Sequence, residues 1–481
     1  MLMTNRQRYA AALTAIMITA VAWTVYFQTQ LPNLFFYKEQ NTVFVLSGDY
    51  LADYFKYPAW MACLIGDFLT QFYYYLYAGA AILGVSLAVL GTLALLSLRR
   101  VGIGMLAATL LSVALMSYEA VSSFYFMHRL SSLYAMIIAF AIYLVFSALL
   151  NRCRYYAVLI ALLLSPVVYW LCGYGLWIFH ALLLMRLAVM LMMRQKVVQY
   201  AAVVALPVIC AVAILGIRHC CPLSAEGALT YPGIGKLKMP NRELERYLAV
   251  DNEFYFGRYN NVIQMVENTA APSEQMQILR CMAYARQGRL TDVMTMPQKP
   301  ELGTFVTINE KSPITAINLM NELYYTIGDM TMTERAAMMA MVFSPQARNS
   351  RYMKRLAEAN LVSGDTAAAM KFLRILDKTI VYHKWAQNHI PATQTPKVKA
   401  EIAEKAQFVN TADSIVIGDD CHTILTNLLD ANPKNTVALD YLLCSDMLAG
   451  KKEMFIDDYN KYGPRPKAIY LQALRSAQTP D

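Results

Sequence analysis

The first half of the chain is a succession of long apolar runs, each separated from the next by a short polar segment. Seven of these runs approach the roughly 20 residues that an α-helix needs to cross a bilayer. Arg6 and Arg8 precede the first run as in a signal peptide, but no small-residue cleavage site follows it, so we interpret it as an uncleaved span. The pattern predicts a seven-helix transmembrane domain over residues 1–217, with spans at about 9–28, 74–98, 101–118, 133–150, 155–172, 174–193 and 197–217.

The apolar pattern changes after residue 217. Residues 218–242 contain the Gly and Pro residues typical of a linker. Residues 243–481 have ordinary charge density and a helical period, and strands are hard to find in them. The sequence therefore predicts an all-α protein in which a transmembrane domain is followed by a helical domain.

The helical domain contains a recurring unit in which an apolar helix ends at glycine and a second helix follows. The clearest example is "LAEANLVSGDTAAAMKFLRIL", where small Ala369 lies at the expected helix crossing. The unit recurs at Gly257, Gly288, Gly328, Gly364 and Gly450, and the first four of these glycines are 31, 40 and 36 residues apart. This recurrence resembles the tetratricopeptide-repeat family. The resemblance implies an α-solenoid of stacked helical hairpins whose concave surface binds a protein or peptide, although packing alone would also explain the pattern.

Basic residues are distributed unevenly along the first half. Residues 1–217 contain twelve Lys and Arg but only five Asp and Glu. Because this basicity lies in short connections between apolar runs, it indicates a bilayer as partner and argues against nucleic acid. The positive-inside rule places the basic connections, and with them the N-terminus, in the cytoplasm. The C-terminal domain is then outside. The connections concerned carry Arg6 and Arg8, Arg99 and Arg100, Arg152 and Arg154, and Arg194 and Lys196.

The connection at residues 31–70 is too long for a simple turn and mixes aromatic residues with acids. It predicts two short amphipathic helices lying in the outer membrane interface. Asp49 and Asp53, four residues apart, would share a face of the first of them. The following "QFYYYLY" is typical of an interfacial aromatic belt.

Candidate functional residues of the first half fall into two groups. Two ionisable residues, His180 and Arg186, lie within the sixth predicted span, where Arg186 either pairs with another helix or extends to the cytoplasmic interface. The remainder are expected at the outer surface, where all five acids are joined by a histidine and an arginine: Glu39, Asp49, Asp53, Asp67, Glu119, His128 and Arg129.

This arrangement resembles the GT-C glycosyltransferases in topology. The resemblance implies a catalytic acid soon after the first span, which would be Glu39 or Asp49. It also implies a lipid-linked sugar at the outer leaflet, and a divalent metal is possible in that case. Outside this interpretation we expect no cofactor. Loop acids are more often solvated or helix-capping residues, so catalysis remains an alternative.

The segment "GDDCHTILTNLL" groups Asp419, Asp420, Cys421 and His422. Four consecutive side chains cannot all reach one metal, and an N-cap by Asp419 or Asp420 explains the acids, so we predict no metal site here. The cysteines beyond residue 217 show no zinc or redox spacing. A structural disulfide remains open.

The whole chain also resembles an uncharacterised family of multi-pass membrane proteins from Bacteroidota. The segments "YKEQNTVFVLSGDYLADYF" and "DFLTQFYYYLYAGA" carry this resemblance, which implies a bacterial inner membrane and a periplasmic C-terminal half. The first hypothesis is an inner-membrane protein that presents a periplasmic tetratricopeptide-like domain to a protein or peptide. A GT-C-like transferase, or an inactive relative, is the second, and a transporter is the third.

Overall fold

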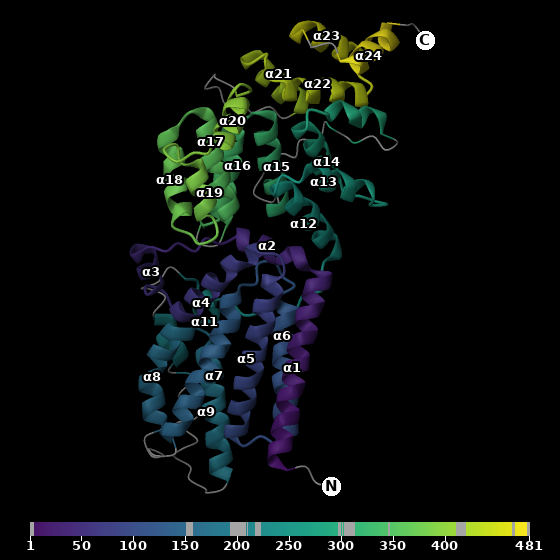
Figure 1. Ribbon diagram of the computed structural model, residues 1–481. Helices are drawn as coiled ribbons and strands as arrows, with labels where there is room; N and C mark the ends of the chain where they lie inside the picture. The colour runs from purple at the N-terminus through teal and green to yellow at the C-terminus, as the bar shows by residue number, and fades with distance from the viewer. Residues whose placement is uncertain are drawn as a thin grey trace. The chain divides into compact units, whose positions relative to one another are not determined.

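The computed structural model describes residues 4–150, 157–192, 208, 210–216, 223–296, 300, 302, 313–344, 347–409, 420–463 and 467–478. All regular elements in these residues are helices. The chain divides into two compact units, residues 1–245 and 246–481 (Figure 1). The all-α prediction is therefore confirmed for the described residues.

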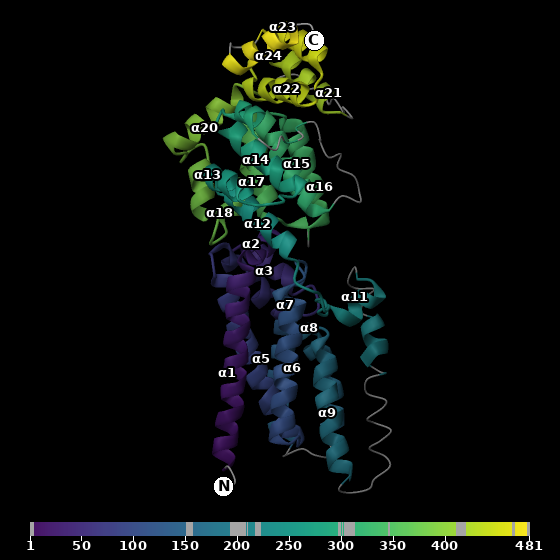
Figure 2. The same cartoon turned by 90° about the vertical axis from the view of Figure 1, so that its right-hand side faces the viewer.

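The first unit is a bundle of long apolar helices with short helices at one end (Figures 1 and 2). Within the described residues, four helices are long and apolar enough to cross a membrane: α1 (Asn5–Gln30), α5 (Ala78–Val101), α6 (Met105–Ser122) and α7 (Leu130–Leu150). Helices α8 (Ala157–Cys172) and α9 (Gly175–Met192) match the fifth and sixth predicted spans but have shorter apolar stretches. Of the seventh predicted span, residues 208 and 210–216 are described as helical, and its other residues lie outside the description.

The bundle exposes large apolar side chains along its length. Ile18 and Val21 of α1, Leu106 of α6 and Leu163 of α8 are each more than half exposed. A water-soluble protein rarely exposes such extended apolar surfaces, whereas lipid tails solvate them. These faces fit helices that cross a membrane.

The basic N-terminus and the 31–70 segment lie at opposite ends of the bundle. The guanidinium Cζ of Arg99, near the end of α5, lies 5.9 Å from the centre of the Tyr9 ring, near the start of α1. The arginines in the last turn of α5 therefore lie at the same end as the basic N-terminus. The residues at 31–70 lie at the opposite end, where Lys38 contacts the carbonyl of Ser123 beyond α6.

The 31–70 segment contains three short helices instead of the two expected: α2 (Pro32–Gln40), α3 (Gly48–Tyr54) and α4 (Trp60–Thr70). A 3-10 turn, η1 (Gln71–Tyr74), connects α4 to α5. Helix α4 packs against α7 and α8, within the unit. A Cβ atom added to Gly66 would lie only 2.6 Å from the Ser131 backbone nitrogen, so glycine permits this close approach. Only α3 keeps an open acidic face.

Residues 223–235, within the segment expected to be a linker, pack on the first unit. They include α11 (Ala225–Thr230). The Tyr169 hydroxyl donates to the carbonyl of Ala228 at 2.6 Å, and the Trp177 indole donates to the carbonyl of Leu229 at 3.0 Å. This part of the chain is therefore bound to the ends of α8 and α9.

The second unit consists of helices that mostly pack against their neighbours in sequence. They are α12 (Arg242–Tyr255), which begins in the first unit, α13 (Tyr259–Glu267), α14 (Glu274–Arg286), η3 (Leu290–Thr295), α15 (Ile314–Ile327), α16 (Met330–Phe343), α17 (Ser350–Ser363), α18 (Thr366–Asp377), α19 (His383–His389), α20 (Pro396–Ala406), α21 (Cys421–Ala431), α22 (Thr436–Leu448), α23 (Lys452–Tyr462) and α24 (Ala468–Gln478). Helix α22 departs from this order because it also packs against η3 and α15.

The five glycines of the recurring unit all adopt the left-handed conformation that favours glycine. Their φ angles lie between 69° and 87°, and each follows the end of a helix. Ala369, expected at a close helix crossing, is fully buried in α18. The predicted helix–glycine–helix unit is therefore confirmed at these positions.

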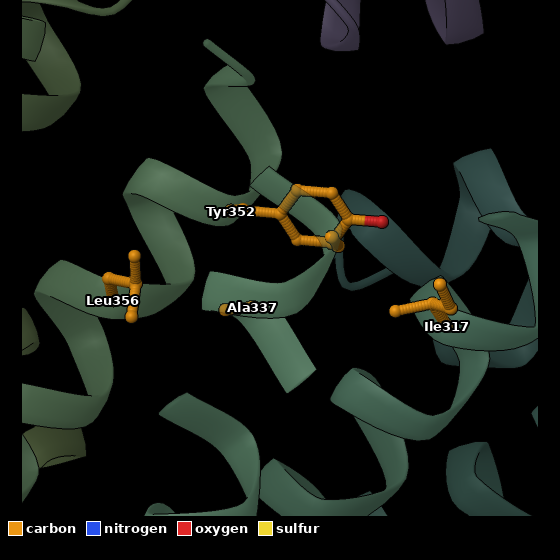
Figure 3. Close-up of a cluster of buried hydrophobic side chains, with 5 residues drawn as sticks. Ile317, Ala337, Tyr352 and Leu356 are labelled. Atoms are coloured by element: carbon orange, nitrogen blue, oxygen red, sulfur yellow. The ribbon is translucent and has the colours of Figure 1, made fainter. Parts of the chain in front are cut away.

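One buried cluster shows how consecutive helices share a core. Ile317 of α15, Ala337 of α16 and Tyr352 and Leu356 of α17 meet with at most 2 % of each side chain exposed (Figure 3). The Tyr352 hydroxyl donates to the side-chain oxygen of Asn318, so its polar end is satisfied while its ring is buried.

Candidate functional sites

The two residues favoured as catalytic acids occupy different environments. Glu39 is buried in α2, with only 2 % exposed. Asp49 is exposed in the first turn of α3, where a carboxylate interacts favourably with the helix N-terminus. Asp53, on the same face of α3, pairs with Lys56 at 2.7 Å in a pair that is largely exposed.

Asp67 and Arg129 join α4 to the residue just before α7. Nη2 of Arg129 lies 2.9 Å from both carboxylate oxygens of Asp67. The Tyr54 hydroxyl donates to Oδ2 of the same carboxylate at 2.9 Å. Burial, followed by the charge of Asp67, raises the pKa of Tyr54, so this phenol stays protonated and donates. Both oxygens of Asp67 are therefore engaged in holding the segment together.

Glu119 and His128 form a second buried pair, 3.1 Å apart. The other oxygen of Glu119, Oε1, is buried and has no hydrogen-bond partner among the described residues. Lys38 lies nearby and donates to the carbonyls of Ser123 at 2.7 Å and His128 at 3.3 Å. Burial lowers the pKa of Lys38 to about 7, although the charge of Glu119 opposes this shift. The group therefore combines a buried carboxylate, a histidine and a buried lysine.

The two ionisable residues of the sixth predicted span lie in α9. The His180 ring nitrogen Nε2 is 2.9 Å from the hydroxyl of Ser165 in α8. Arg186 is partly buried, and the Tyr143 hydroxyl of α7 is buried without a hydrogen-bond partner among the described residues. The pairing of Arg186 with another helix stays a prediction.

The second unit contains an ionic network that links α12, α15 and α17. The Arg351 guanidinium binds both oxygens of Asp251 at 2.6 and 2.9 Å, and it also reaches Glu322 at 3.2 Å. Arg355 binds Glu322 at 2.5 Å and Glu358 at 2.7 Å. Burial alone would raise the pKa of Glu322, but the two guanidinium groups outweigh it and hold the pKa at about 2.

Cations gather around the ring of Tyr325, next to this network. Arg355 Cζ, Lys405 Nζ and Arg286 Cζ lie 3.8, 4.5 and 5.0 Å from the ring centre. The side chain of Lys405 makes no hydrogen bond or ion pair with any residue that the structure describes. Burial and the positive charges of Arg286 and Arg355 lower its pKa well below the usual range for lysine.

The same face continues to Lys354, which directly precedes Arg355 on α17. Its ammonium donates to the Tyr255 hydroxyl at 2.9 Å and lies 4.8 Å from the centre of the Trp385 ring. Burial lowers the pKa of Lys354 to about 8. The basic–aromatic face, defined as Arg286, Tyr325, Arg351, Lys354, Arg355, Tyr255, Trp385 and Lys405, thus carries five cations.

Acids do not balance these cations. Asp251, Glu322 and Glu358 are the acids that pair with them in the described residues. The face is therefore electropositive, and an oxyanion would bring the charge that Lys405 and Arg286 lack.

Comparison with known proteins assigns the chain to a family. The model of a family of unknown function, DUF6057, matches residues 7–480. The chain belongs to the DUF6057 family. No curated protein and no solved structure matches the chain. DUF6057 membership agrees with the resemblance to an uncharacterised family, but it assigns no activity.

Sequence reasoning about this DUF6057 chain missed the basic–aromatic face and Lys38. A signal for the face was present, because Arg351, Lys354 and Arg355 have the i, i+3, i+4 spacing that places three side chains on one side of a helix. Nothing near Lys38 signalled its burial. Its contact with Ser123 spans 85 residues, so only the tertiary structure reveals it.

The structure also bears on the cysteines and on the predicted helix cap in the "GDDC" segment. Cys281, Cys421 and Cys444 are buried and free, whereas Cys220 and Cys221 lie outside the described residues. The Asp420 side chain accepts from the Thr423 backbone nitrogen and caps α21, which confirms the predicted N-cap. Asp419 lies outside the described residues.

Proposed function

We propose that the chain is a bacterial inner-membrane protein whose C-terminal unit binds an acidic segment of a partner protein outside the cytoplasm. The basic–aromatic face is the observation that supports this proposal. It combines cations in excess of acids with the partly buried rings of Tyr255 and Trp385 and the buried ring of Tyr325. Such a surface favours a ligand that offers carboxylates and apolar stems together.

The membrane placement rests on the first unit. Its apolar exposed faces fit a bilayer, and the arginines at the end of α5 lie with the basic N-terminus at the end opposite the 31–70 segment. The positive-inside rule places the basic end in the cytoplasm. With seven spans, the C-terminal unit lies in the periplasm, and its helix–glycine–helix units form a tetratricopeptide-like domain.

Lys405 distinguishes a binding surface from a purely structural ion network. Arg351 and Glu322 are deeply buried and satisfy one another, as structural ion pairs do. Lys405 is only partly buried, lies beside two guanidinium groups and lacks an acid partner among the described residues. An acidic ligand would offset this repulsion, so its binding would be favourable at this point.

The test uses the detergent-solubilised full chain and a labelled octaglutamate peptide, with octalysine as the reference probe. We expect octaglutamate to bind, its affinity to fall as salt rises, and octalysine not to bind. Lys405→Ala and Arg286→Ala should each weaken binding about tenfold or more, because a charged hydrogen bond contributes about 1.5–3 kcal/mol.

Lys399→Ala is the matched control, because Lys399 lies on the same helix as Lys405 but is exposed. This variant should bind octaglutamate like the wild type. Equal losses in the Lys399 and Lys405 variants would show that the binding is a general charge effect, which would contradict the proposal.

A second function is favoured by the group of Glu119, His128 and Lys38. A buried carboxylate with one oxygen free of hydrogen bonds, next to a histidine, is a possible general base. In a GT-C-like transferase this group would act on an acceptor for a lipid-linked sugar. Asp49 is less suited to act as the general base than expected. It is exposed, and its carboxylate has no basic partner among the described residues.

A further inference from the structure

Helices α21, α22 and α23 bring together three side chains that no segment of the sequence groups. His422 lies in the first turn of α21, Asp446 in the last turn of α22, and Asp458 in the middle of α23. Gly450, with φ of 70°, reverses the chain between α22 and α23. Each helix therefore contributes one side chain to one location.

These side chains are close enough to share a ligand. One ligand atom from each of His422, Asp446 and Asp458 lies within 4.8 Å of the other two. The His422 nitrogen Nε2 is 2.7 Å from Oδ2 of Asp458. Two ligands of one zinc ion, each about 2.0–2.2 Å from the metal, are about 3.3 Å apart. Small side-chain rotations suffice to reach that geometry.

The Asp446 carboxylate is buried and lacks a partner for one of its oxygens. Only 2 % of the residue is exposed, and its Oδ2 atom has no hydrogen-bond partner among the described residues. A buried carboxylate oxygen without a donor is costly. Burial, followed by repulsion from Asp458, raises the pKa of Asp446 to about 7. A divalent cation would satisfy the free oxygen and offset the repulsion.

We propose that His422, Asp446 and Asp458 bind a divalent transition metal of the zinc class and thereby cross-link α21, α22 and α23. One imidazole nitrogen and two carboxylate oxygens form a ligand set that zinc accepts, with a fourth position left for water. The His422 side chain is 31 % exposed, which provides a path for the ion. Asp420, which the sequence placed beside His422, caps the helix and takes no part.

The test measures zinc binding to the tag-free full chain in detergent after treatment with a chelator. Isothermal titration with Zn²⁺ should detect one site that Asp446→Asn weakens at least about 10- to 100-fold. Asp457→Asn is the matched control, because Asp457 is the exposed neighbour of Asp458. His383→Ala controls for zinc binding at a surface histidine–aspartate pair. His383 lies 3.0 Å from Asp377, and both side chains are more exposed than those of His422 and Asp458.

Thermal unfolding separates metal binding from a purely structural role of Asp446. Without metal, Asp446→Asn should be as stable as the wild type or more stable, because it removes repulsion between two carboxylates. With Zn²⁺, the melting temperature should rise in the wild type and in both controls but not in Asp446→Asn. Co²⁺ should produce the visible absorption of a four-coordinate site in the wild type but not in Asp446→Asn.

Two results would overturn the proposal. One is a zinc stoichiometry and affinity that are the same in the wild type and in Asp446→Asn. The other is a loss of stability in Asp446→Asn, relative to the wild type, that is equally large without and with Zn²⁺. Asp446 would then act only through its contacts within the protein.

Discussion

The Nη2 atom of Arg129 lies 2.9 Å from both carboxylate oxygens of Asp67, and this pair fixes α4 to the start of α7. The 31–70 segment is anchored by this contact between residues that are 62 positions apart. The sequence places Asp67 with the acids of the outer membrane surface, and in the structure only 5 % of its own surface is exposed.

Removing Asp67 should therefore destabilise the first unit. Asp67→Ala leaves the Arg129 guanidinium buried without its partner, and we expect a loss of about 3–5 kcal/mol in the free energy of unfolding. Asp53→Ala is the control, because the exposed Asp53–Lys56 pair contributes about 0–1 kcal/mol. Thermal unfolding of the detergent-solubilised protein measures both. Similar melting temperatures for the two variants would refute a structural role of the Asp67–Arg129 pair.

Gly66 tests the close packing of α4 on α7. Gly66→Ala places a Cβ atom 2.6 Å from the backbone nitrogen of Ser131, which cannot move like a side chain. Overpacking of this kind costs about 1–3 kcal/mol, so the melting temperature should fall. Gly48→Ala has no neighbouring heavy atom within 4 Å and should leave the melting temperature nearly unchanged. A harmless Gly66→Ala would show that the two helices are further apart.

The topology proposal predicts the activity of reporter fusions in a bacterial host. A reporter active only in the periplasm should be active after Asp481 and inactive after Arg100, because Arg99 and Arg100 belong to the basic end of the bundle. A cytoplasmic reporter should show the opposite pattern. If the fusion after Asp481 is active only in the cytoplasm, the periplasmic placement of the second unit is wrong.

Lys38 should make stability depend on pH. Its pKa is lowered from 10.5 to about 7 in the folded protein, so between these values the unfolded chain binds more protons. The free energy of unfolding should then rise with pH from about 7 to 10, by up to a few kcal/mol. Lys38→Met should flatten this rise, and Lys56→Met, at an exposed lysine, should not. Denaturant unfolding at several pH values measures the slope, and an equal slope in all three proteins would contradict the buried charge of Lys38.

An alanine scan of the five acids separates the two proposed functions. If the protein acts by binding, Glu39→Ala, Asp49→Ala, Asp53→Ala and Glu119→Ala should each complement a deletion strain once the phenotype is corrected for protein level. Asp67→Ala should fail only in proportion to its lower level. Complete loss of function in Glu119→Gln at a normal protein level would favour the transferase instead, because this change keeps the shape of the side chain and removes its basicity.

The sequence by itself determined the all-helical class and the apolar runs that form the long helices of the first unit. An apolar run indicates which stretch of the chain is buried in lipid or protein. A glycine at a helix end indicates that the backbone there adopts a positive φ angle. This explains why Gly257, Gly288, Gly328, Gly364 and Gly450 were identified correctly from their neighbours alone. The Asp420 cap was recognisable for the same reason, since it acts within one helical turn.

Only the tertiary structure decided which charged groups meet. Asp67 faces Arg129, Glu119 faces His128, and Lys405 lies beside Arg286, but the sequence offers no period that relates these partners. Their pairing depends on how helices pack, and packing depends on the summed shapes of many side chains rather than on any one residue. The same holds for His422, Asp446 and Asp458, which three different helices bring together. Helices and their ends could be predicted from the sequence because their causes lie within a few residues. These sites could not, because they arise from contacts between distant segments.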